Sequence, residues 1–263
     1  MLLNMDNKQQ NFKIETAYNS IHMCYHKGRL ELRSHDKALQ SVINLENRHC
    51  LELKNLEYLV SVLLFIPAPR RILMLGTAAG SLLHFLSHHY PQADITAVDI
   101  DSELIERLLG MGILPAADAR LDYIYADAAE YIVQCEQNYD LVLFDIFSGA
   151  QSPAWLIAKT VINQLYELVS EQGALACNLL IDSDHDFNLF YRDFRQAFEQ
   201  RSLSLPVAGL ENRITHGVRA TTTVNDMSAN LQKALALSDK LGFDLMPILA
   251  VIYNTNPVGR GLI

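Results

Sequence analysis

Residues 71–81 read RILMLGTAAGS, an apolar run followed at once by a turn of small residues. The run at 71–75 is typical of a buried strand. Gly76 and Gly80 then bracket a loop whose backbone N–H groups can face a ligand at the start of a helix. The small side chain of Ala78 permits a close approach. The stretch predicts the first strand–loop–helix unit of a nucleotide-binding sheet, although an ordinary strand-to-helix turn explains it equally well.

The chain beyond this stretch alternates between apolar runs and helical patterns. Strands separated by helices imply right-handed crossovers and a parallel sheet with helices on both faces. Residues 203–219 suit two closing strands, and residues 226–252 suit a broken helix. The remaining strands are expected at 95–100, 121–125, 141–146 and 174–180, and the helices at 80–90, 102–110, 128–135, 154–169 and 186–200.

The chain before this stretch has a different pattern. Short alternating runs between residues 12 and 45 are separated by turn-like breaks, which favours a small antiparallel β unit. Residues 50–66 carry apolar side chains at helical spacing and end at Pro67. We therefore predict a small β domain over residues 1–50 and a Rossmann-like nucleoside-binding domain over residues 51–263.

Acidic residues end three of the predicted strands. Asp99 lies 19 residues beyond Gly80, a spacing at which a carboxylate can accept hydrogen bonds from ribose hydroxyls. Asp127, followed by Ala128, either accepts from an adenine amino group or caps the next helix. Asp145 ends a nearly all-apolar strand, where a carboxylate is costly unless it is used or paired.

These motifs all fall where ligands bind in open α/β sheets, beyond the carboxyl ends of the strands. Their order is that of a class I methyltransferase fold. The rival is a dinucleotide-dependent dehydrogenase, but Gly76-Thr-Ala-Ala-Gly80 departs from its usual G-x-G-x-x-G loop. Asp101 precedes a predicted helix and is expected to be its N-cap.

Composition excludes several classes of function. The net charge is −9, and the scattered Lys and Arg residues form no basic patch, so we expect no nucleic acid partner. Half of the residues are hydrophobic, yet no apolar run is long enough to span a bilayer. The four cysteines and nine histidines show no metal-ligand spacing, so no metal is expected. Without a signal-peptide pattern, we expect a cytoplasmic protein.

Several segments together resemble the spermidine synthase family: QSVINL (40–45), the 71–82 run, VDID (98–101), DARLDYIYADAAEYI (118–132), YDLVLFDIFSGAQSPAWL (139–156) and GALACNLL. That family transfers an aminopropyl group from decarboxylated S-adenosylmethionine to putrescine. The resemblance implies that Gln40 contacts the nucleoside, Asp99 the ribose, Asp127 the adenine and Asp145 the reaction centre. Members often form dimers, so a homodimer is an open expectation.

The sequence departs from that family at acceptor positions. Ala79 stands where the family has an Asp in its glycine loop, and Ser148 stands where it has a second Asp after Asp145. Loss of acidic acceptors removes general-base help worth roughly 10²- to 10⁴-fold in rate. We therefore expect a transferase for S-adenosylmethionine or its decarboxylated form, acting on a small acceptor such as an amine, with methyl transfer preferred over aminopropyl transfer.

Two alternatives stay open at this point. The first is an authentic polyamine aminopropyltransferase in which Asp145 or Glu57 compensates for the missing carboxylates. The second is a non-catalytic module that binds a nucleoside or dimerises.

Overall fold

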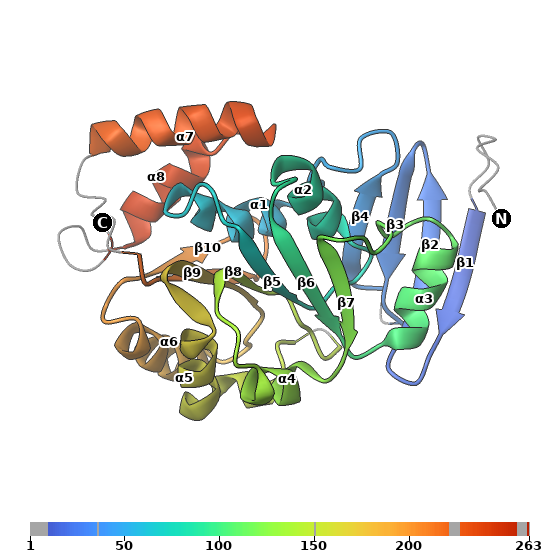
Figure 1. The fold of residues 1–263 in the computed structure, drawn as a ribbon, viewed down its shortest axis with the longest axis horizontal. Helices are drawn as coiled ribbons and strands as arrows, with labels where there is room; N and C mark the ends of the chain where they lie inside the picture. The colour runs from blue at the N-terminus through green and yellow to red at the C-terminus, as the bar shows by residue number, and fades with distance from the viewer. Residues whose placement is uncertain (1–9, 36, 150, 221–226, 257–261, 263) are drawn as a thin grey trace.

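The computed structural model describes residues 10–35, 37–149, 151–220, 227–256 and 262 of the chain. Figure 1 shows a large twisted sheet with helices on both faces and a smaller sheet beside it. The large sheet has seven strands in the order β10-β11-β9-β8-β5-β6-β7. These strands are β5 (Arg71–Leu75), β6 (Asp94–Asp99), β7 (Leu121–Tyr125), β8 (Tyr139–Phe144), β9 (Val169–Leu179), β10 (Ser202–Pro206) and β11 (Arg213–Val218).

Strands β5 to β9 pair in parallel, and the β10–β11 hairpin closes the sheet in the antiparallel sense. The predicted α/β fold is confirmed. The described helices after the small sheet are α1 (Lys54–Val60), α2 (Ser81–His89), α3 (Ser102–Gly110), α4 (Ala128–Gln134), α5 (Lys159–Glu167), α6 (Asp184–Ala197), α7 (Met227–Leu241) and α8 (Met246–Thr255).

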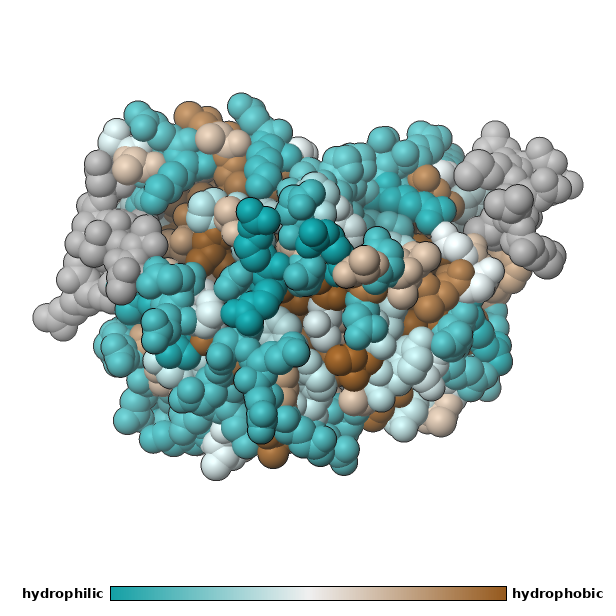
Figure 2. Space-filling model, in the orientation of Figure 1, coloured by the Kyte–Doolittle hydropathy of each residue, from teal (hydrophilic) through white to brown (hydrophobic). Residues whose placement is uncertain are grey.

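Alternation along each central strand supplies a hydrophobic core on both faces of the sheet. In β5, Ile72 and Met74 join the core under α1, α2, α3, α7 and α8, whereas Leu73 and Leu75 join the core under α4, α5 and α6. Figure 1 shows α5 and α6 on one side of the sheet and α7 and α8 on the other. In Figure 2, hydrophilic residues cover most of the visible face. None of the described helices is both long and apolar enough to cross a membrane.

The N-terminal unit is a four-stranded antiparallel sheet of β1 (Gln10–Glu15), β2 (Ser20–His26), β3 (Arg29–Arg33) and β4 (Leu39–Asn44). Its buried side chains, such as Ile21 and Leu30, belong to the same core as α1 and α2. The small β unit is thus present and packs directly against the larger sheet's helices. The division of the chain into two domains at residue 50 stays a prediction.

Element boundaries differ most clearly from the sequence expectation at two points. The helix expected at 154–169 is a 3-10 turn, η2 (Ala154–Ile157), followed by α5, because Ala158 takes an extended backbone and starts a new helix. Strand β9 begins at Val169 rather than at residue 174, since its first residues pair with the start of β8 across a register irregularity. The apolar periodicity of the sequence predicts neither the break at Ala158 nor the early start of β9.

Gly76 fixes how closely β5 and β8 approach at their carboxyl ends. Its φ of +90° lies in the left-handed region. A Cβ atom there would lie 2.4 Å from the backbone oxygen of Asp145, closer than any real contact. Only glycine therefore fits the first position of the loop, whereas Gly112, with φ of +67°, has open space around it.

We predict that Gly76→Ala lowers the free energy of unfolding by roughly 3 kcal/mol or more, since it adds a backbone clash to left-handed strain. Gly112→Ala is the matched control, because it meets only the strain, which costs about 1–2 kcal/mol. Urea denaturation of both variants measures the difference. Equal losses in the two variants would contradict the close approach at Gly76.

Candidate active site

The carboxyl ends of β5, β6, β7 and β8 bring the predicted motifs to one edge of the sheet. Neighbouring strands pair in parallel, so their following loops all emerge on the same side. Direct contacts join them: the Thr77 backbone N–H donates to Asp99 Oδ2 at 2.9 Å, and Gly76 lies against the Asp145 backbone. The Ala126 N–H, just before Asp127, donates to the Asp99 carbonyl at 3.0 Å.

The Asp99 carboxylate is held by the backbone at the end of β6. Besides the Thr77 bond, its Oδ1 accepts from the Asp101 N–H at 3.0 Å. Burial is the main cause that raises the pKa of Asp99 above its usual value, and these two backbone bonds oppose it. Each carboxylate oxygen can accept more than one hydrogen bond, so lone pairs stay available to hydroxyl donors.

The glycine loop reaches α2 through two residues with positive φ. Ala78 has φ of 45° and Gly80 has φ of 82°, and Gly80 directly precedes α2. A left-handed alanine is strained, which indicates that the surrounding contacts impose this loop shape. Ala79 is fully buried. The small residues therefore serve a tight turn between β5 and the start of α2.

Asp127 and Ala128 lie at the start of α4. Asp127 Oδ1 accepts from the Ala129 N–H at 2.8 Å, so this residue is the helix cap that the sequence offered as one of two readings. Its side chain is only partly buried, and Ala128 is buried. A contact with a ligand through the second oxygen stays a prediction.

Asp145 follows β8 and forms a hydrogen bond that the sequence did not predict. Its Oδ1 accepts from Asn178 Nδ2 at 2.9 Å, and Asn178 Oδ1 accepts from Asn212 Nδ2 at 2.9 Å. Burial raises the pKa of Asp145 to about 6, and the bond from Asn178 opposes that rise. A polar amide inside the apolar run ALACNLL was the one available signal for Asn178.

Ser148 is not joined to Asp145 by any hydrogen bond in the part of the chain that the structure describes. It is exposed, and its backbone N–H donates to the Gln151 carbonyl at 2.8 Å. Gln151 in turn bonds to Asp182 beyond the end of β9. Ser148 therefore belongs to a loop tied to the end of β9 at the same edge of the sheet, and its expected catalytic role stays a prediction.

The small sheet reaches this edge through two sets of contacts. Ser41 Oγ lies 2.9 Å from Ser81 Oγ, which places β4 against the start of α2. Asp101 caps α3, as predicted, and also accepts from Thr16 Oγ1 and Asn19 Nδ2 at 2.6 Å each. Gln40 neighbours Ser41 on β4 and is partly buried, and its contact with a nucleoside stays a prediction.

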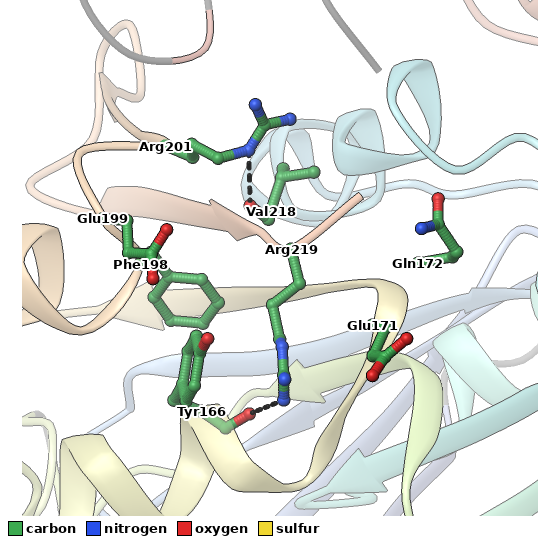
Figure 3. A pocket seen from close by; sticks show the side chains of 8 residues that line it. All are labelled: Tyr166, Glu171, Gln172, Phe198, Glu199, Arg201, Val218 and Arg219. Atoms are coloured by element: carbon green, nitrogen blue, oxygen red, sulfur yellow. Dashed lines mark hydrogen bonds between the residues drawn. The ribbon is translucent and has the colours of Figure 1, made fainter. Parts of the chain in front are cut away.

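The surface also has a hollow of about 270 Å³ that lies away from these motifs. Glu171, near the start of β9, lines it together with Arg201 and Arg219 (Figure 3). Arg219 donates to the carbonyls of Tyr166 and Val169 and stacks on the Tyr166 ring. The arginine is thus engaged in holding the end of α5, at the opposite end of the sheet from Asp145.

Known proteins resemble this chain in both sequence and fold. Residues 56–180 match the family model of the spermine/spermidine synthase domain. A polyamine aminopropyltransferase of Neisseria meningitidis serogroup A is 27% identical over 221 residues, which cover 84% of each chain.

Solved structures show the same architecture. A probable spermidine synthase from Corynebacterium glutamicum superposes with a TM-score of 0.72 at 19% identity, covering 85% of this chain and 86% of that one. Human methyltransferase-like protein 13, in complex with SAH, superposes with a TM-score of 0.61 at 22% identity, covering 72% and 89%. The chain is therefore a spermidine synthase-like protein with a methyltransferase fold.

Proposed function

We propose that this protein transfers an aminopropyl group from decarboxylated S-adenosylmethionine to a small amine. The observation that carries the proposal is the Asp145 carboxylate, which is partly buried at the carboxyl end of β8 against the glycine loop. Burial raises its pKa to about 6, close to the pH at which the enzyme would work. A carboxylate tuned in this way suits proton transfer.

The donor would lie across the carboxyl ends of β5 and β6. Asp99 has free lone pairs for the ribose hydroxyls, and the turn formed by Gly76, Ala78 and Gly80 lies directly beside this carboxylate through the Thr77 bond. Asp127 would receive the adenine amino group, and Gln40 would cover the nucleoside from β4. These assignments rest on the family resemblance together with the shared position of the motifs at one edge.

Asp145 would act on the acceptor. An amine is an ammonium ion at neutral pH and must lose a proton before its nitrogen attacks the carbon beside the donor's sulfonium. The new C–N bond forms as the C–S bond breaks, and methylthioadenosine leaves. The carboxylate attracts the ammonium and takes its proton, because opposite charges and a matched pKa both favour that transfer.

The relatives do not support the preference for methyl transfer drawn from the sequence. The Neisseria relative, which spans most of this chain, is named an aminopropyltransferase. The missing carboxylates at Ala79 and Ser148 instead affect which acceptor amine the site would bind. With Ala79 fully buried and Ser148 exposed and neutral, the second charge of a diamine lacks the partners that the resemblance implies. Putrescine would then be a poor acceptor.

We predict that the protein releases methylthioadenosine from decarboxylated S-adenosylmethionine only when an amine is present, and that putrescine supports slow turnover. Ser148→Asp should raise the rate with putrescine, since the new carboxylate attracts the acceptor's cation. Chromatography of the nucleoside and amine products measures both rates. Gln232→Glu, which adds the same charge on the exposed surface of α7, is the control.

Three results would contradict this reading. Formation of S-adenosylhomocysteine from S-adenosylmethionine would show methyl transfer. Donor binding without turnover on any amine or in cell extract would indicate a non-catalytic module. Rapid spermidine formation by the unmodified protein would show that Ser148 imposes no penalty.

The Asp145 carboxylate also has a stability cost that can be measured. Its folded-state pKa of about 6 lies above the ordinary value of 3.8, so the ionised side chain destabilises the fold at higher pH. That cost shrinks as the pH falls below about 6 and is gone below about 3.8, where the carboxyl is protonated in both states. A group retained at such a cost supports a functional role.

We predict that Asp145→Asn raises the free energy of unfolding at pH 7.5, by up to about 3 kcal/mol, because the amide keeps the bond from Asn178 without a buried charge. The gain should vanish near pH 4. Urea denaturation at both pH values tests this. Asp122→Asn, at an exposed carboxylate on β7, is the control and should change stability by less than about 0.5 kcal/mol. A stability loss in Asp145→Asn at pH 7.5 would refute the electrostatic cost.

A further inference from the structure

Three side chains form a continuous line of hydrogen bonds that ends at the candidate reaction centre. Asn212 Nδ2 donates to Asn178 Oδ1 at 2.9 Å, and Asn178 Nδ2 donates to Asp145 Oδ1 at 2.9 Å. The three residues come from separate elements: the β10–β11 turn, β9 and the end of β8. Strand pairing aligns them, since Asn178 lies opposite Ile214 in the β9–β11 register.

The direction of this line is fixed by the chemistry of an amide. One side of the Asn178 side chain only accepts hydrogen bonds, and the other only donates. Because Asn212 supplies a donor to the accepting side, the donating side must face Asp145. Asn178 is completely buried, so no water competes for either side. The backbone of Asn212 is held in place, because its backbone carbonyl accepts from the Val207 N–H at 3.0 Å across the turn.

The line occupies one oxygen of Asp145 and leaves the other open. Oδ1 accepts from Asn178, whereas Oδ2 has no hydrogen-bond partner among the residues that the structure describes. The causes that shift the pKa of Asp145 are burial and the Asn178 bond, with no charged side chain of the described residues among them. The protonation of this carboxyl therefore depends on its burial and on the neutral amide donor of Asn178 that opposes it.

We propose that Asn178 and Asn212 are positioning residues: they hold Asp145 ionised and direct its Oδ2 toward the acceptor amine. This rests on the proposed function for the identity of the acceptor, but not for the control of Asp145. Asn178 acts directly on the carboxylate. Asn212 acts only through Asn178, by preventing its amide from turning its oxygen toward Asp145.

The test is a pH titration of the Asp145 carboxyl carbon by NMR in the unliganded protein, assigned by comparison with Asp145→Asn. Asn178→Leu removes the donor, so the pKa of Asp145 should rise by about one unit or more. Asn212→Leu should also raise the pKa of Asp145, by a smaller amount, even though this variant keeps Asn178, the residue that contacts Asp145. Thr215→Val is the matched control, since Thr215 is buried on β11 beside the line and outside it.

An unchanged pKa in either leucine variant would overturn the proposal, as would an equal rise in Thr215→Val. If Asn178→Leu does not fold, the Asn212→Leu titration alone decides the matter, because Asn212 lies at the end of the line that does not contact Asp145. Where turnover is measurable, the acidic limb of the pH–rate profile should move upward with the titrated pKa. If the pKa of Asp145 shifts as expected but no amine is turned over, the positioning role of Asn178 and Asn212 is supported and the aminopropyl reaction is refuted.

Discussion

The close approach of the β5 and β8 backbones at Gly76 and Asp145 is the constraint on which the rest of the site depends. A side chain at residue 76 would overlap the Asp145 carbonyl, so the loop after β5 can pass over the end of β8 only with glycine there. This contact brings the loop next to the Asp145 carboxylate. The Thr77 bond to Asp99 then ties the same loop to β6. The Gly76–Asp145 and Thr77–Asp99 contacts therefore bring the ends of β5, β6 and β8 together into one site.

Carboxylates at this edge have different environments, and their roles follow from that difference. Asp99 is held by two backbone donors and is the ligand candidate, whereas Asp101 caps α3 and is held by Thr16 and Asn19, which makes it a structural support. Asp145 has a single neutral donor and is destabilised by burial. It is therefore the carboxylate most able to exchange a proton near neutral pH. In the proposed reaction, Ala79 and Ser148 offer no acidic side chain, so that task would fall to Asp145.

Much of the fold could be predicted from the sequence, because long apolar runs and the acidic residues that end them are local signals. Strands β5 to β8, the cap at Asp101 and the shared edge of Gly76, Asp99 and Asp145 all follow from such patterns. The Asn178–Asn212 line could not be predicted, since it depends on the register between β9 and β11. Likewise, the bonds from Thr16 and Asn19 to Asp101 join residues more than 80 positions apart.

The binding of a nucleoside at this edge is the central claim, and calorimetric titration of methylthioadenosine tests it most directly. Asp99→Ala should weaken binding by roughly ten- to a hundred-fold, as expected for loss of charged hydrogen bonds worth about 1.5–3 kcal/mol. Asp94→Ala, at the opposite end of the same strand, should bind like the unmodified protein. Unchanged affinity in a folded Asp99→Ala variant would contradict the account.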